Sequence, residues 1–109
     1  MEAILTSIKK MLGIAEEYTH FDADIIIHIN SVLAILEQLG VGNDGFSITG
    51  SSENWNDFLR DNKKLEMVKS YVFLKVRLLF DPPQNSSLIE AVNRQISELE
   101  WRINVAADS

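Results

Sequence analysis

Residues 65–83, LEMVKSYVFLKVRLLFDPP, decide the fold of this 109-residue chain. Their apolar side chains fall on two adjacent helical stripes that cover more than half of the circumference. The stripes consist of Leu65, Val68, Val72, Val76 and Leu79, and of Met67, Tyr71, Leu74 and Leu78. Such a helix must be surrounded by other elements. Because Pro82 lacks a backbone donor and disfavours the α conformation at Asp81, the helix is predicted to end near Phe80.

Two amphipathic helices are predicted before this stretch. The first spans residues 2–12 and ends at Gly13, which can adopt the left-handed conformation. The second spans residues 22–39, with Asp22 as its N-cap and Gly40 after its last turn. In the first helix, Ile4, Leu5, Ile8, Met11 and Leu12 lie at helical spacing. In the second, the inward stripe consists of Ile25, Ile29, Val32, Leu36 and Leu39.

Residues 40–52, GVGNDGFSITGSS, form a glycine-rich loop after the second helix. Asn43-Asp44-Gly45 is a turn signal, and residues 46–49 alternate as a short strand or one arm of a hairpin would. This loop is predicted to be flexible, and a part of the molecule that moves. Its candidate mobile residues are Gly40, Gly42, Gly45, Phe46, Ile48 and Gly50.

The remaining pattern completes an all-α fold. Ser52 is expected to cap a short helical segment around Trp55, and Asp61 or Asn62 to open the central helix. Ser86 or Ser87 is expected to cap a last helix that ends near Val105, with Leu88, Val92, Ile96, Leu99 and Ile103 inward. The prediction is one domain over residues 1–109, a bundle of about four main helices plus the short segment, with a disordered tail at 106–109.

Composition restricts the function classes. With 46% hydrophobic and 24% charged residues, the chain resembles a soluble globular domain with one core. A net charge of -6 argues against a nonspecific DNA-binding surface, which needs Lys and Arg to displace phosphate counterions. The chain has no cysteine, hence no disulfide and no thiol nucleophile. Neither a signal peptide nor an uncharged apolar run of spanning length is evident, so no membrane association is expected.

No motif in the chain predicts an enzyme. Residues 40–45 match GxGxxG, but they follow a helix and lead into FSIT, whereas dinucleotide-binding loops follow a strand and open a helix. His20, Asp22, Asp24 and His28 contain metal-ligand types, yet Asp22 is better placed as a cap and no third inward ligand is evident. No nucleophile elbow occurs. We therefore assign no catalytic, cofactor-binding or metal-binding residue.

Four residues violate the pattern of their own helices. Ile27, Phe73 and Trp101 project onto polar faces, with Arg94 beside Trp101. Together they indicate a subunit or partner interface, although packing within one copy explains them equally well. Lys75 projects into an apolar face. Its stem can lie on apolar surface with the ammonium at the edge, or the ammonium can pair with a carboxylate across a subunit boundary.

Several segments together resemble the head-tail connector, or head completion, proteins of tailed bacteriophages. The resemblance runs from about Ile8 to Val105. Its most specific pieces are WNDFL at 55–59, LFDPP at 79–83 and ELEWR at 98–102. These are packing and turn signatures, so they indicate a fold family rather than a chemistry.

The resemblance implies a non-enzymatic structural protein of the virion neck, made in the cytoplasm of the bacterial host, without a cofactor. Such proteins form a ring beneath the portal, a dodecamer by resemblance, while the isolated chain can be a monomer. The ring extends the channel through which packaged DNA passes without sequence-specific binding, and it contacts the portal and the next neck or tail protein. Two alternatives stay open: a helical adaptor that binds one partner through an exposed aromatic patch, and a small enzyme.

Overall fold

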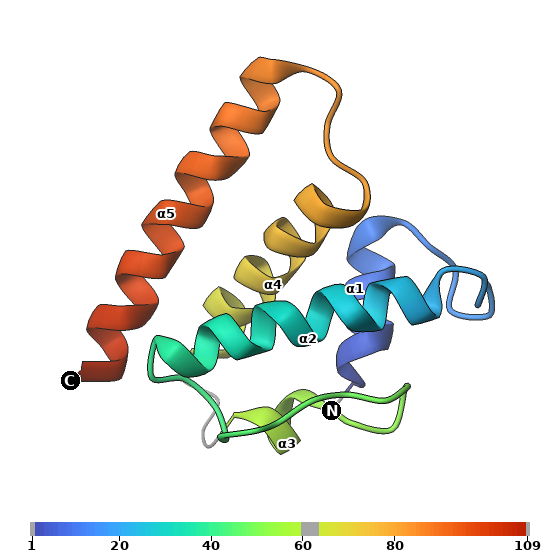
Figure 1. Ribbon diagram of the computed structural model, residues 1–109, viewed down its shortest axis with the longest axis horizontal. Helices are drawn as coiled ribbons and strands as arrows, with labels where there is room; N and C mark the ends of the chain where they lie inside the picture. The colour runs from blue at the N-terminus through green and yellow to red at the C-terminus, as the bar shows by residue number, and fades with distance from the viewer. Residues whose placement is uncertain (1, 60–63, 109) are drawn as a thin grey trace.

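The computed structural model describes residues 2–59 and 64–108, with side chains up to residue 106. It is an all-α fold, as the sequence predicts, and no strand occurs within these ranges. The helices are α1 (Ile4–Leu12), α2 (Asp22–Gln38), α3 (Trp55–Phe58), α4 (Leu65–Phe80) and α5 (Ser86–Asp108) (Figure 1). In the described part of the chain, no helix is both long and apolar enough to span a bilayer.

Helix α4 is the centre of the molecule, because α1, α2 and α5 all pack against it. Its side chains at Val68, Tyr71, Val72 and Val76 are buried. The core continues into α1, α2, α3 and α5 through Ile4, Ile8, Ile25, Ile29, Leu33, Leu36, Trp55, Phe58, Ile96 and Ile103. The prediction that residues 65–80 organise the fold is therefore confirmed.

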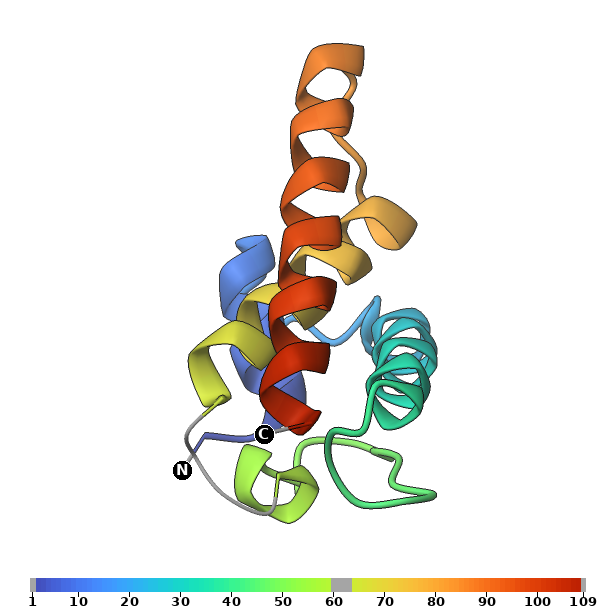
Figure 2. The same cartoon turned by 90° about the vertical axis from the view of Figure 1, so that its left-hand side faces the viewer.

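Helix α5 packs mainly on α4, and its N-terminal end stands clear of the other helices (Figures 1 and 2). Two inward assignments are wrong for this reason: Leu79 is 55% exposed and Leu88 is 54% exposed. Both lie near the turn between α4 and α5. The ends of these two helices therefore leave apolar surface uncovered.

The helix caps differ from those predicted. Phe21, not Asp22, is at the N-cap position of α2, because Asp22 forms an ion pair instead. Asn54, rather than Ser52, caps α3, and it forms a reciprocal capping box with Asp57. The Asn85 carboxamide accepts hydrogen bonds from the first turn of α5, where a serine was expected.

The ends of α1, α4 and α5 follow the prediction to different extents. Gly13 has φ 81° and closes α1, as predicted. Helix α4 begins at Leu65 after Lys64, and the expected cap at Asp61 or Asn62 lies outside the described residues. Helix α5 continues through Asp108 instead of ending near Val105, so the expected tail at 106–109 is helical to that residue. No glycine or proline stops it there.

The loop between α2 and α3 contains no strand at residues 46–49. Its backbone pairs with a side chain instead: Asn30 Oδ1 accepts from the Ile48 N–H at 2.8 Å, and Asn30 Nδ2 donates to the Ile48 carbonyl at 3.0 Å. Ile48 is buried at 2% exposure. Asn43 N donates to the Phe58 carbonyl at 2.9 Å. The Gly45 N–H also donates to Glu37 Oε1, so these contacts tie the loop to α2 and α3 at several points.

Candidate interaction surfaces

The five residues predicted for an interface lie on three helices. Ile27 on α2 is 62% exposed, and Trp101 on α5 is 68% exposed. Arg94 is exposed as well, seven residues before Trp101 and therefore on the same side of α5. Phe73 and Lys75 on α4 are half-buried. The structure therefore does not gather them into one site.

The outer strip of α5, formed by Arg94, Trp101 and Val105, faces away from the core. Val105 is 48% exposed, and the buried residues Ile96 and Ile103 point the other way. Trp and Arg are enriched at interface centres relative to the rest of a protein surface. The strip is thus an apolar surface that the single copy leaves uncovered.

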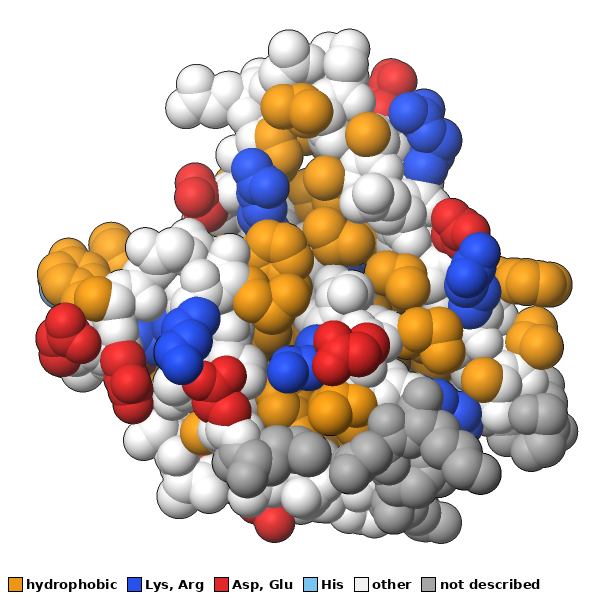
Figure 3. All heavy atoms as spheres, turned by 180° about the vertical axis from the view of Figure 1, so that it is seen from behind, with side chains coloured by type: hydrophobic (Ala, Val, Ile, Leu, Met, Phe, Trp, Pro, Cys, Tyr) orange, Lys and Arg blue, Asp and Glu red, His pale blue; other side chains and the backbone are white. Residues whose placement is uncertain are grey.

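A groove between α1, α4 and α5 explains the position of Phe73. The groove has a volume of about 520 Å³. Its apolar lining consists of Met11, Met67, Phe73, Leu74 and Leu99, with Ser70 and Gln95 between them and Glu98 and Arg102 at the rim. Figure 3 shows hydrophobic side chains gathered in the middle of this face, with charged side chains on both sides. Phe73 therefore packs partly on the core and partly lines an open groove.

Lys75 lies beside an aromatic ring. Its Nζ is 6.0 Å from the centroid of the Tyr71 ring, a cation–π contact at the limit of the usual range. Tyr71 donates from its hydroxyl to Glu100 Oε2 at 2.7 Å. Burial, followed by this hydrogen bond to a carboxylate, raises the pKa of Tyr71 above its ordinary value. Among the described residues Lys75 has no ion pair, and its pairing across a subunit boundary stays a prediction.

Lys9 is a buried cation that our sequence analysis missed. Its side chain is 3% exposed, and its Nζ lies 2.8 Å from Asp22 Oδ1. The ammonium also donates to the carbonyls of Glu16 at 2.9 Å and Tyr18 at 2.8 Å. At about 100° per residue, Lys9 projects close to Leu5, whereas Lys10 projects to the polar side. That projection was the signal that separates the two lysines.

The link between α1 and α2, residues 13–21, is fixed by Lys9 and presents aromatic side chains. Tyr18 is 50% exposed and Phe21 is 36% exposed. The Phe21 ring packs edge-on against Phe80 at a centroid distance of 5.3 Å, and the His20 ring packs against Phe21 at 4.8 Å. These contacts hold the link in one conformation against the end of α4.

The candidate metal ligands do not converge. Asp22 is paired with Lys9, while the His28 ring lies 6.5 Å from that of Phe80. Within residues 2–59 and 64–108, no three His, Cys, Asp or Glu side chains are arranged to hold a metal ion.

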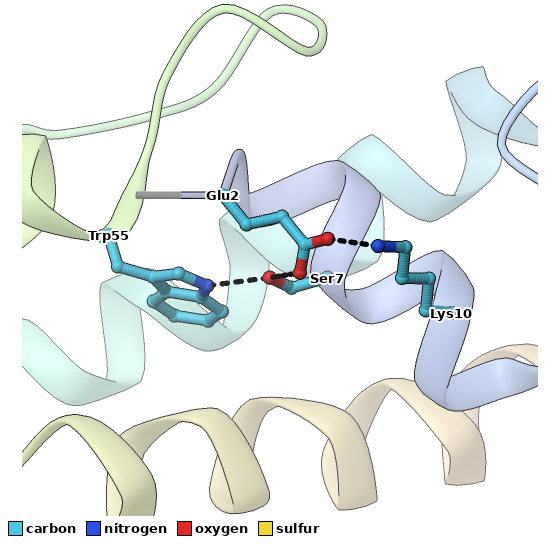
Figure 4. A network of polar contacts seen from close by, with 4 residues as sticks. All are labelled: Glu2, Ser7, Lys10 and Trp55. Carbon is cyan, nitrogen blue, oxygen red and sulfur yellow. Dashed lines mark hydrogen bonds and ion pairs between the residues drawn. The ribbon is translucent and has the colours of Figure 1, made fainter.

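A polar network joins the start of the chain to α3. Trp55, fully buried, donates from Nε1 to Ser7 Oγ at 3.0 Å, and Ser7 donates to Glu2 Oε1 at 2.8 Å (Figure 4). Lys10 forms an ion pair with the other oxygen of Glu2. The hydrogen bond from Lys10, followed by that from Ser7, lowers the pKa of the Glu2 carboxyl. The tryptophan of the WNDFL segment is thus a core anchor.

Comparisons with known proteins identify a family. A protein-family model described as "Phage connector protein" matches residues 4–109. No curated protein matches the chain, and neither does any solved structure. The matched range covers every helix described above.

Proposed function

We propose that this chain, which belongs to the phage connector protein family, has a structural role in the virion neck. It acts there as a subunit of a ring beneath the portal. The ring extends the DNA channel and connects the head to the next neck or tail protein. The family consists of structural proteins that connect phage components. The ring, its dodecameric size and its position at the portal are the proposed refinement of that role.

The observation that supports assembly most strongly is the exposure of Trp101. An indole that is 68% exposed leaves a large apolar area in water. The groove that contains Phe73 lies between α1, α4 and α5, next to Leu99. A ring needs two unlike surfaces on each copy, because each contact joins one patch to a different patch of the neighbour. The outer strip of α5 and the groove are two unlike uncovered surfaces, and each can meet a different patch of a neighbouring molecule.

The net charge of -6 fits a channel through which DNA slides. A lining rich in Lys and Arg would bind phosphates and release counterions, and so it would retain the DNA. We propose that the channel surface is poor in these residues. Mapping the channel-lining residues in assembled particles tests this proposal, and a lining composed mostly of Lys and Arg would contradict it.

The 40–52 loop is proposed to order further against a neighbour in the assembly. Its contacts through Glu37, Asn30 and Phe58 hold it to α2 and α3, while Asp44 and Ser47 are exposed. Hydrogen exchange of the loop amides should therefore slow on assembly. Equal protection before and after assembly would contradict this part of the proposal.

Replacing Trp101 with Ala tests the proposed function. Because aromatic side chains at interface centres commonly contribute about 2 kcal/mol or more, the apparent Kd of self-association or portal docking should rise roughly 30-fold. Mass measurements at several concentrations give the Kd, and circular dichroism should show unchanged helix content. Asn93→Ala, on the same helix and also exposed but on a different side from Trp101, serves as the control. A stable one-to-one complex without rings would support the adaptor alternative instead.

A further inference from the structure

We propose that the groove between α1, α4 and α5 of one copy receives the 13–21 link of a second copy, in a head-to-tail contact. This inference rests on the proposed self-assembly and names the two surfaces that meet. It leaves the outer strip of α5 available for a different neighbour.

The groove presents apolar surface beside a helical stripe that carries two cations, while its own charged lining residues, Glu98 and Arg102, pair with each other. Lys69, Phe73 and Arg77 are spaced four apart and form one stripe along α4. Phe73 lines the groove, and Arg77 lines the adjoining hollow that shares Met11 and Phe73 with it. Among the described residues, neither Lys69 nor Arg77 forms an ion pair. The groove therefore suits an aromatic segment that carries carboxylates.

The 13–21 link has that chemistry. Glu16 and Glu17 are exposed and precede the half-exposed Tyr18, and no Lys or Arg occurs between residues 11 and 59. Figure 3 shows carboxylate side chains beside hydrophobic ones at its left-hand edge, the end of the molecule that this link occupies in Figure 1. Neither glutamate forms an ion pair in the described part of the chain. The negative charges of the link are therefore complementary to the positive charges of Lys69 and Arg77 beside the groove.

The link is also organised before binding. Lys9 fixes the carbonyls of Glu16 and Tyr18, and the Phe21 ring rests on Phe80. A segment that is already ordered loses less conformational entropy on docking than a free loop does. These contacts hold the link at the surface of its own molecule, where a second copy can reach it. One link and one groove per copy give a heterologous contact that repeats from copy to copy.

Pairwise disulfide trapping tests the contact, because the chain has no cysteine of its own. Thr19→Cys marks the link, Ser70→Cys marks the groove, and Ser31→Cys on the exposed side of α2 is the control. Equimolar mixtures of two full-length variants are oxidised under identical conditions. The T19C–S70C dimer should form about tenfold faster than T19C–S31C or either homodimer, since docking raises the effective concentration of the two thiols.

Charge reversal gives a second, independent test. E16K/E17K in the T19C chain, or K69E/R77E in the S70C chain, should remove most of the rate advantage, and combining the two should restore it. Added salt should reduce the wild-type advantage through screening. Equal rates for all pairs, or a failure of the combined reversal to restore the advantage, would overturn the contact.

The same samples separate this inference from the proposed function. If mass measurements show rings while T19C–S70C has no advantage, then other surfaces join the copies, and only the contact proposed here is wrong. If the unmodified chain neither associates nor binds the portal protein, the proposed function fails as well.

Discussion

Lys9→Met should destabilise the fold strongly, whereas the same change at Lys10 should have little effect. Lys9 and Lys10 are neighbours on α1, but the Lys9 side chain is 3% exposed and that of Lys10 is 60% exposed. Methionine keeps an unbranched apolar stem of similar length and removes the ammonium. The pair of variants therefore isolates the buried charge from the loss of a lysine as such.

The expected cost follows from the groups that lose their partner. Among the described residues, the buried Asp22 Oδ1 accepts no hydrogen bond. Its polar partner is the Lys9 ammonium, with which it forms an ion pair. Removing one member of a buried ion pair costs about 3 to 5 kcal/mol. The Asp22 side chain is 26% exposed, and the freed carbonyls lie in an exposed link. Partial access to water lowers our expectation to about 2 to 3 kcal/mol.

Urea unfolding followed by circular dichroism measures this difference. At an m-value typical of small domains, Lys9→Met should lower the midpoint by roughly 1 to 2 M with m unchanged. Asp22→Asn should cost less than Lys9→Met, because the ammonium keeps its two carbonyl partners. The double variant should cost less than the sum of the two single changes. Equal midpoint shifts for Lys9→Met and Lys10→Met would refute the reasoning.

Three further predictions follow from other contacts. Gly42→Ala should lower the free energy of unfolding by about 2 kcal/mol or more in thermal unfolding, because φ is 84° and a Cβ would lie 2.3 Å from the Phe58 ring. Gly45→Ala, with φ 72° and open space around it, should cost only about 1 kcal/mol. Equal costs would contradict the steric argument. Asn30→Ala should speed amide exchange in the loop between α2 and α3 beyond any change in α4, and unchanged exchange would show that burial alone holds the loop. The pKa of the Glu2 carboxyl is lowered in the folded protein, so its contribution to stability is complete above the ordinary pKa of 4.5 and is lost as pH falls through the pKa of the folded state. Glu2→Gln should therefore flatten the dependence of stability on pH in that acidic range. An unchanged dependence would exclude this contribution.

The residues that violate the helical pattern of the sequence pointed to surfaces of the molecule. The pattern did not show how those surfaces are built. Trp101 lies on the polar side of an amphipathic helix, so periodicity alone predicted its exposure, which the structure confirms. Phe73 violates its pattern in the same way, yet it is half-buried because α1 and α5 flank it. The difference depends on which helices pack beside each face, and that is a property of the tertiary arrangement. Whether either residue contacts a neighbouring subunit stays a prediction.

The amino-acid sequence alone predicts the class of the fold, the central helix and the helix ends at Gly13 and Phe80. Apolar spacing at 3.6 residues and the prolines after Phe80 act locally, so they can be read without the partners of each helix. The role of Lys9 depends on the packing of the helices, because its partners are carbonyls and a carboxylate 7 to 13 positions away, in the link and α2. The same holds for the Asn30 clamp on Ile48, 18 positions away. Polar groups that bond across such separations leave no periodic pattern, so their pairing is decided when the helices pack.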